Sequence, residues 1–263
     1  MIVSRKILFA IIILALVLNI PRGQLAASGQ IWVSTSTSYT DSIGYYRVVG
    51  EIFNDGDVSL AYNKVVATFY NKTGQVVGTD YTYAMLDVVP PGRWSPFILT
   101  LNDENQSKKV NHYSLTSTYQ TTATAPQKLI ILSNSTYIDN IGYKRIVGEI
   151  KNTGTITATF VKIIVTCYNG TGFVVAADYS YASTTDLAPN ATSPFELSID
   201  DERTPLVASY RLTATSHEYA AVPEYPVLFL ALLPATVLLL ALRKRHRNLS
   251  SMVQIVTVTY SVG

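Results

Sequence analysis

A stretch of eleven residues occurs twice in this chain, at positions 44–54 and again at 142–152. Both copies read Gly-Tyr-x-Arg, then Val or Ile, then Val-Gly-Glu-Ile-x-Asn. The offset of 98 residues (142 minus 44) is too long for a solenoid repeat and matches a small all-β domain. The chain is therefore expected to hold two related β domains in tandem.

The similarity extends well beyond this stretch, since about half of the positions from 39 to 104 are identical to those 98 residues later. Each copy shows short extended segments separated by Gly, Asn and Pro turns. The expected strands are 31–39, 46–53, 62–70, 75–83, 96–101 and 113–118, and then 129–137, 144–151, 160–168, 173–181, 194–199 and 210–215. This pattern predicts an all-β fold of two tandem immunoglobulin-like β-sandwiches.

Alternation along the third strand of each copy predicts which side chains face the core. The expected inward positions are Val65, Ala67 and Phe69, and in the second copy Ile163, Val165 and Cys167. Cys167 is the only cysteine, so no intramolecular disulfide can form. Because it stands where Phe69 stands, we interpret it as a small buried filler rather than a nucleophile.

Both ends of the chain are apolar and basic. Residues 1–28 carry Arg5 and Lys6, a short apolar run and small residues near 25–28, which predicts a secretory signal peptide, with an uncleaved signal anchor as the alternative. Residues 222–242 are expected to form a transmembrane anchor, and the basic cluster that follows it predicts a cytoplasmic C-terminus for residues 243–263. The partner of this end is therefore a membrane, and the middle of the chain is expected to be extracellular at the cell membrane.

The charge of the middle region argues against nucleic acid as a partner. Seven of the 20 basic residues lie near the two ends, and Glu224 is the only acidic residue outside positions 29–221. That region keeps 13 basic against 17 acidic residues, a net charge of −4.

We expect one sandwich at 29–120, a linker at 121–126 and a second sandwich at 127–221. The second sandwich is expected near the membrane, with the first stacked outward.

Repeated tyrosines form the candidate binding surface. Residues two apart on a strand share a face, so each copy offers two neighbouring rings, Tyr81 with Tyr83 and Tyr179 with Tyr181. Such rings could stack on a glycan or on a partner protein. The alternative is that they pack at the sandwich edge with their hydroxyls in water. Asp80 and Asp178 are expected to point to the opposite face.

Acidic motifs were compared between the copies as candidate metal or catalytic sites. Asn-Asp-Gly-Asp at 54–57 becomes Asn-Thr-Gly-Thr at 152–155, so a turn explains both copies and a calcium loop explains one. The pair at 103–104 persists at 201–202 and is expected to be a solvated loop. Glu51 and Glu149 are expected to be ordinary exposed strand residues. We therefore predict no metal site, no cofactor and no catalytic residues.

Sequons for N-glycosylation are frequent in the predicted exported region. Those at Asn71 and Asn169 fall on equivalent hairpin turns, where a glycan could extend into solvent. The candidate glycosylation sites are Asn71, Asn105, Asn134, Asn169 and Asn190.

Several of these motifs together resemble a known family. Val-Gly-Glu-Ile at 49–52, Thr-Phe-Tyr at 68–70 and Ser-Pro-Phe at 95–97 are similar to the FxLYD domain, and 147–150 and 193–195 repeat the likeness. The resemblance implies a small immunoglobulin-like sandwich of exported prokaryotic, often archaeal, proteins, and it implies no catalytic residues. Pro223, Glu224, Tyr225 and Pro226, with the apolar run and basic cluster behind them, resemble the archaeal PEF-CTERM sorting signal. A plain transmembrane anchor is the alternative.

The sequence thus predicts a cell-surface anchored, non-catalytic structural or adhesive protein. The alternative is an extracellular binding module that recognises a glycan or a partner protein through its repeated tyrosine faces. An enzyme is the least favoured reading, because no triad, acid and base pair or metal cluster has a plausible spacing.

Overall fold

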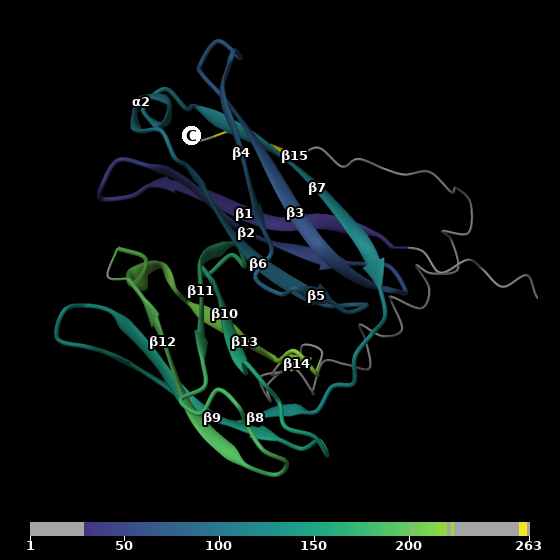
Figure 1. The fold of residues 1–263 in the computed structure, drawn as a ribbon. Coiled ribbons are helices and arrows are strands. Elements are labelled where there is room, and N and C mark those ends of the chain that lie inside the picture. Colours follow the sequence, from purple (N-terminus) through teal and green to yellow (C-terminus); the bar gives the residue numbers. More distant parts are fainter. Residues whose placement is uncertain (1–28, 201, 220–221, 224–257, 262–263) are drawn as a thin grey trace, which may run out of the picture.

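The computed structural model describes residues 29–200, 202–219, 222–223 and 258–261 (Figure 1). The predicted signal peptide, most of the predicted anchor and the basic cluster lie outside the described residues, as do Glu224, Tyr225 and Pro226. Within the described residues, no helix combines the length and apolar content that a membrane crossing requires.

The first sandwich is built from two antiparallel sheets. One has the order β1-β2-β6, formed by β1 (Ile31–Thr40), β2 (Tyr46–Asn54) and β6 (Trp94–Leu101). The other has the order β15-β7-β3-β4, with β7 (His112–Thr122), β3 (Ser59–Tyr70) and β4 (Val76–Tyr83). The short β5 (Val88–Val89) pairs with β3, and the one-turn α2 (Glu104–Ser107) connects β6 to β7.

The second sandwich repeats this arrangement. Its first sheet has the order β12-β9-β8, with β8 (Leu129–Ile138), β9 (Lys144–Asn152) and β12 (Thr192–Ile199). Its second has the order β11-β10-β13-β14, with β10 (Lys162–Tyr168), β11 (Val174–Tyr181), β13 (Ser209–Thr215) and β14 (Val222–Pro223). A 3-10 turn at Thr204–Leu206 takes the place of α2. Every strand expected from the sequence is present, with ends that shift by at most four residues.

Strand register confirms that the copies are equivalent residue by residue. Phe69 faces Gly78 on β4, and Cys167 faces Ala176 on β11, each followed by a bulge at the next residue of β3 or β10. On the other side Phe69 faces Tyr113 and Cys167 faces Tyr210. The offset between the copies is therefore 98 residues up to β12 and 97 in β7 and β13.

Each sandwich encloses its own core, and the predicted inward positions are confirmed. Val65, Ala67 and Phe69 are fully buried in the first core, as are Ile163, Val165 and Cys167 in the second. The cores lie between the two sheets of each sandwich. Burial alternates along β3 from residue 63 onward, whereas β10 is buried on both faces because the first sandwich covers its outer face.

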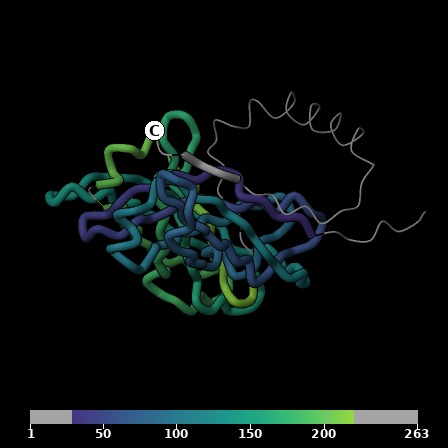
Figure 2. The backbone as a smooth tube through the Cα atoms, turned by 90° about the horizontal axis from the view of Figure 1, so that it is seen from above, coloured from purple at the N-terminus to yellow at the C-terminus, as the bar shows by residue number. Residues whose placement is uncertain are grey.

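The two sandwiches also pack against each other. The outer face of β1-β2-β6 lies on the outer face of β10, β11 and β13, in the middle of Figure 1. Figure 2, seen from above, shows the two units overlapping along the view, as this stacking requires. The sandwiches thus share a broad sheet face instead of meeting only at the linker.

The described parts near the C-terminus both extend the sheets. β14 pairs with Thr213 and Ala214, so the second sandwich extends two residues past the predicted boundary at 221 and includes Pro223 of the candidate sorting motif. β15 (Val258–Ser261) pairs with residues 112–115 of β7. This pairing places the tail beside the first sandwich, whereas a membrane span at 225–242 would put them on opposite sides; the two arrangements exclude each other in one molecule.

Candidate functional site

The most unusual polar group of the molecule is a carboxylate between the two sandwiches. Glu51 lies on β2 with only 3% of its surface exposed. Its Oε2 accepts a hydrogen bond from the Tyr168 hydroxyl at 2.8 Å and pairs with Arg211 NH1 at 3.0 Å. The Arg211 guanidinium also lies 4.5 Å from the centre of the Trp94 ring. A charge from each sandwich is therefore buried against the other.

Burial in this interface shifts the pKa values of Glu51 and Tyr168. Desolvation raises the pKa of Glu51, although Arg211 and the Tyr168 hydroxyl both act to lower it. Desolvation also raises the pKa of Tyr168, so its hydroxyl stays protonated and donates to the carboxylate. The expectation that Glu51 is an exposed strand residue is wrong, because a second sheet covers the face on which it lies; Glu149 is exposed as expected.

Apolar and polar contacts surround this pair. Val49, Val174 and Ala177 are buried together, with Tyr39, Met85, Ile98 and Tyr168 packed around them. Lys162 donates from Nζ to the Met85 carbonyl at 2.6 Å, and Thr37 donates to the Val174 carbonyl at 2.6 Å. The interface therefore combines an apolar centre with hydrogen bonds at its rim.

Comparison of the copies shows that this interface is specific to one pair of faces. The residues that form the interface differ from those at the equivalent positions of the two outward faces. The outward faces carry Ser114 in place of Arg211, Thr192 in place of Trp94, Ser183 in place of Met85 and Glu196 in place of Ile98. Val174 is fully buried, whereas its counterpart Val76 is 60% exposed. The outward faces have thus lost the residues that hold the inward faces together.

The tyrosine pairs lie on the edge strands β4 and β11. All four rings are about half exposed, and each pair meets edge to face with centroids 6.1 Å apart. A lysine lies near one ring of each pair: Lys64 Nζ is 3.8 Å from the centre of Tyr81 and Lys162 Nζ is 5.4 Å from that of Tyr179. The tyrosine pairs, Tyr81 with Tyr83 and Tyr179 with Tyr181, are therefore accessible aromatic surfaces.

The neighbouring acids do not join these surfaces. Exposure alternates over the last four residues of each strand, where each tyrosine is more exposed than the residue before it. Asp178 is half-buried on the other face, and burial raises its pKa. The predicted orientation of Asp80 and Asp178 away from the rings is confirmed by this alternation.

The predicted turn at 54–57 is confirmed, and its chemistry is structural in both copies. Asn54 donates from Nδ2 to the carbonyls of Val58 and Val89 and accepts from Gly56 N. Asn152 makes the same three bonds with its equivalents. Asp103 caps α2 by accepting from Gln106 N. Among the described residues, no group of three or more His, Cys, Asp or Glu side chains could hold a metal ion.

Cys167 is buried, as predicted, and burial raises the pKa of its thiol to about 12. A thiol in this state is not a nucleophile near neutral pH.

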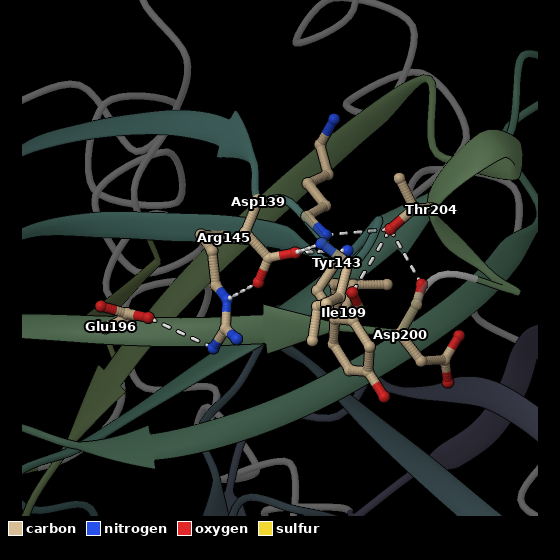
Figure 3. Close-up of polar contacts among 9 residues, drawn as sticks. Asp139, Tyr143, Arg145, Glu196, Ile199, Asp200 and Thr204 are labelled. Carbon is tan, nitrogen blue, oxygen red and sulfur yellow. Dashed lines mark hydrogen bonds and ion pairs between the residues drawn. The ribbon is translucent and has the colours of Figure 1, made fainter.

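A hydrogen-bond network at the hairpin between β8 and β9, called the hairpin lock below, lies beside the second core and was not predicted from the sequence (Figure 3). Asp139 accepts from the backbone N of Ile141 and Tyr143 and from Arg145 Nε, and Arg145 reaches Glu196. Burial raises the pKa of Asp139, but the Arg145 bond and the two amides outweigh it and leave the pKa below its ordinary value.

Asp41 and Arg47 form the same lock in the first sandwich, with the pKa of Asp41 lowered in the same way. The signal was present in the sequence, since both residues recur 98 positions later.

The candidate glycosylation sites differ in their surroundings. Asn71 and Asn169 lie at equivalent hairpin tips, where each Oδ1 accepts from the hydroxyl of its own sequon threonine. Asn105 on α2 and Asn190 in a turn are exposed. Asn134 lies within β8, and its Oδ1 accepts from the Tyr210 hydroxyl at 2.5 Å.

No family model matches the chain, and no curated protein matches it. Among solved structures it is similar to red sea bream transglutaminase, with 8% identity and a TM-score of 0.24 over 76% of this chain and 31% of that one. It is also similar to the exo-chitosanase CsxA of Amycolatopsis orientalis, with 10% identity and a TM-score of 0.29 over 73% of this chain and 26% of that one. A mutant of Bacteroides uniformis beta-glucuronidase 2 is similar with 12% identity and a TM-score of 0.25, over 72% of this chain and 28% of that one. The chain spans less than a third of each, and likenesses at these TM-scores carry no argument.

Proposed function

We propose that this protein is a non-catalytic structural or adhesive protein of the cell surface, in which two FxLYD-like sandwiches act as one rigid unit. The observation that carries the proposal is the buried contact of Glu51 with Tyr168 and Arg211 across the two sandwiches. A buried pair of this kind costs desolvation unless its geometry is held, so it favours one relative orientation of the domains. A fixed orientation suits a spacer that holds its ends at a set distance.

The proposed location follows from the ends of the chain. A signal at 1–28 would export the sandwiches, and an anchor within 222–242 would hold them at the membrane. In the anchored molecule β15 has to leave β7, because the tail is then on the other side of the membrane.

A second candidate is an extracellular binding module that recognises a glycan or a partner protein. It is supported by the tyrosine pairs, which are about half exposed and carry the same edge-to-face geometry in both copies. Aromatic rings held in this way by a rigid strand offer a flat apolar surface to a sugar ring or to another side chain.

One experiment separates the two candidates. The full-length protein is expressed in its source cell, its surface exposure is measured with an impermeant label, and cell adhesion is scored for Tyr81→Ala with Tyr83→Ala. Tyr62→Ala serves as the control, because Tyr62 is exposed but belongs to neither pair. The structural reading expects adhesion to survive both changes, whereas selective loss in the paired variant favours recognition. Absence of the protein from the surface would overturn both.

A further inference from the structure

A pocket of about 400 Å³ opens in the second sandwich between β8 and β13. Its lining residues come from β8 and β9 of one sheet, from β13 of the other and from the segment that leads into β13. Its lining combines Asn134, Thr136, Lys144, Tyr210 and Leu212 with the segment 207–209. The volume falls within the range of pockets that hold small organic molecules, about 300–1,000 Å³.

The first sandwich explains why this space exists. There the Tyr46 ring packs edge to face on Phe69 and Tyr113, with centroids 5.8 and 6.5 Å away. The Tyr46 hydroxyl donates to Ser38 at 2.8 Å, and Tyr46 itself is buried. Three rings thus fill the space between the two sheets at this end of the first sandwich.

Two of those three rings are missing from the second copy. Lys144 stands in the place of Tyr46 and Cys167 in the place of Phe69, while Tyr210 keeps the place of Tyr113. Thr136, the counterpart of Ser38, lines the pocket beside Lys144. The pocket therefore occupies the position that the Tyr46 ring fills in the first sandwich.

A hydrogen bond holds the backbone of Lys144 beside this pocket. Its backbone N donates to Thr204 Oγ1 at 3.0 Å, and Thr204 in turn bonds to the carbonyls of Ile199 and Asp200 (Figure 3). Within the part of the chain that the structure describes, the Lys144 ammonium has no hydrogen bond and no ion pair. A cation without an anionic partner, on a residue that lines a cavity, is a group that a ligand can satisfy.

We propose that the pocket binds a small organic anion, a carboxylate or sulfonate with an apolar body. The anionic group would pair with Lys144, and the hydroxyls of Thr136 and Ser209 lie along the same lining to donate to it. Leu212 and Val207 offer apolar surface to the rest of the molecule. The Tyr210 to Asn134 bond closes one end of the site. This inference does not depend on the proposed structural role.

The test is a fluorine NMR titration of the full chain in nonionic detergent, with 4-fluorobenzoate as the probe. Lys144→Met keeps an apolar side chain of similar length and removes the charge, and we expect it to weaken binding about tenfold. Lys144→Arg should retain binding. Lys109→Met, which removes an exposed lysine of the first sandwich, is the matched control and should leave binding unchanged.

A second variant restores the packing of the first sandwich. Lys144→Tyr combined with Cys167→Phe should fill the pocket, abolish binding and raise the unfolding midpoint. The neutral probe 4-fluorobenzyl alcohol should bind weakly and equally to the unaltered chain and to Lys144→Met. The proposal is overturned if 4-fluorobenzoate does not saturate a site on the unaltered chain, or if Lys144→Met or the filled variant binds it with unchanged affinity.

Discussion

Removal of one partner of the buried pair between the sandwiches is the sharpest test of the interface. In the variant Arg211→Met the Glu51 carboxylate keeps the Tyr168 hydroxyl but loses the cation that pairs with it. Truncation of one member of a buried pair typically costs about 3–5 kcal/mol. Because a quarter of the Arg211 side chain is exposed to solvent, we take the lower end, about 3 kcal/mol. That shifts the docking equilibrium more than about a hundredfold.

Glu51→Gln should cost much less, since the amide oxygen still accepts from Tyr168 and the cation left unpaired, Arg211, keeps a quarter of its side chain in solvent. The double variant Glu51→Gln with Arg211→Met should resemble Glu51→Gln alone. A double-mutant cycle then gives a coupling energy of about 3 kcal/mol between the two residues, because the loss caused by Arg211→Met requires the Glu51 carboxylate.

The pH dependence has a definite sign. Burial raises the folded-state pKa of Glu51 above its unfolded value, so the docked state takes up the proton more readily. Stability of the docked state should therefore fall as the pH rises from the ordinary carboxyl range through the raised pKa. Arg211→Met should deepen that fall, and Glu51→Gln should abolish it.

The assay uses tryptophan fluorescence during urea unfolding of a chain spanning residues 29–223, which keeps β14. Both tryptophans belong to the first sandwich, and Trp94 lies against Arg211, so undocking should shift the emission to longer wavelength. A coupling energy near zero, or a loss on Arg211→Met that is the same from pH 4 to pH 8, would refute the reasoning.

Three further changes test other features of the fold. Gly50→Ala should destabilise the first sandwich by about 1–3 kcal/mol in the same unfolding assay, because the added Cβ would lie 2.6 Å from a carbonyl oxygen of β1; unchanged stability would contradict this packing. Asp41→Asn should remove a contribution to stability that is present above the ordinary carboxyl pKa and is lost as the pH falls through the lowered one, so the acid limb of a thermal melt should flatten. In intact cells the proposed anchor predicts that Val76→Cys reacts with an impermeant maleimide and Ser261→Cys does not, with the buried Cys167 silent in both; reaction at both positions would instead place the tail beside β7.

Strands, turns and inward faces could be predicted because they depend on local alternation and on a repeat that aligns the copies. The Asn turns at 54 and 152 and the inward position of Cys167 are examples. The interface could not be predicted in the same way. Glu51 and Glu149 both stand in the sequence Val-Gly-Glu-Ile, and residues distant in the chain, such as Arg211, distinguish their surroundings. Which outer face is covered depends on how whole sheets dock, which no local pattern encodes.

The pocket is an intermediate case. The two changes that open it, Tyr46 to Lys144 and Phe69 to Cys167, are visible in the aligned copies, and a loss of two rings from one core predicts empty volume. Their proximity is what the sequence does not show, because β2 and β3 belong to different sheets. A comparison of copies thus predicts a cavity only when the structure shows that the changed residues touch.

Divergence between the copies also bears on assembly. The first sandwich docks its β1-β2-β6 face on the β10, β11 and β13 face of the second, which is a head-to-tail contact that could continue from molecule to molecule. The outward faces retain Glu149 and Tyr70 but carry Glu196 and Ser114 where the docked faces have Ile98 and Arg211. A charge now stands in the apolar centre, and the cation for the carboxylate is absent, so continuation is disfavoured.

Restoring those two residues should reverse this effect. Glu196→Ile with Ser114→Arg is expected to produce head-to-tail oligomers, measured by sedimentation velocity against the unaltered chain. Within one chain the short linker supplies an effective concentration of about a millimolar, and no linker joins separate molecules. Association should therefore appear only in concentrated samples and should disappear on adding Glu149→Gln with Tyr70→Ala. Sedimentation that stays identical to the unaltered chain at every concentration would show that other differences between the copies, such as Trp94 against Thr192, prevent the contact.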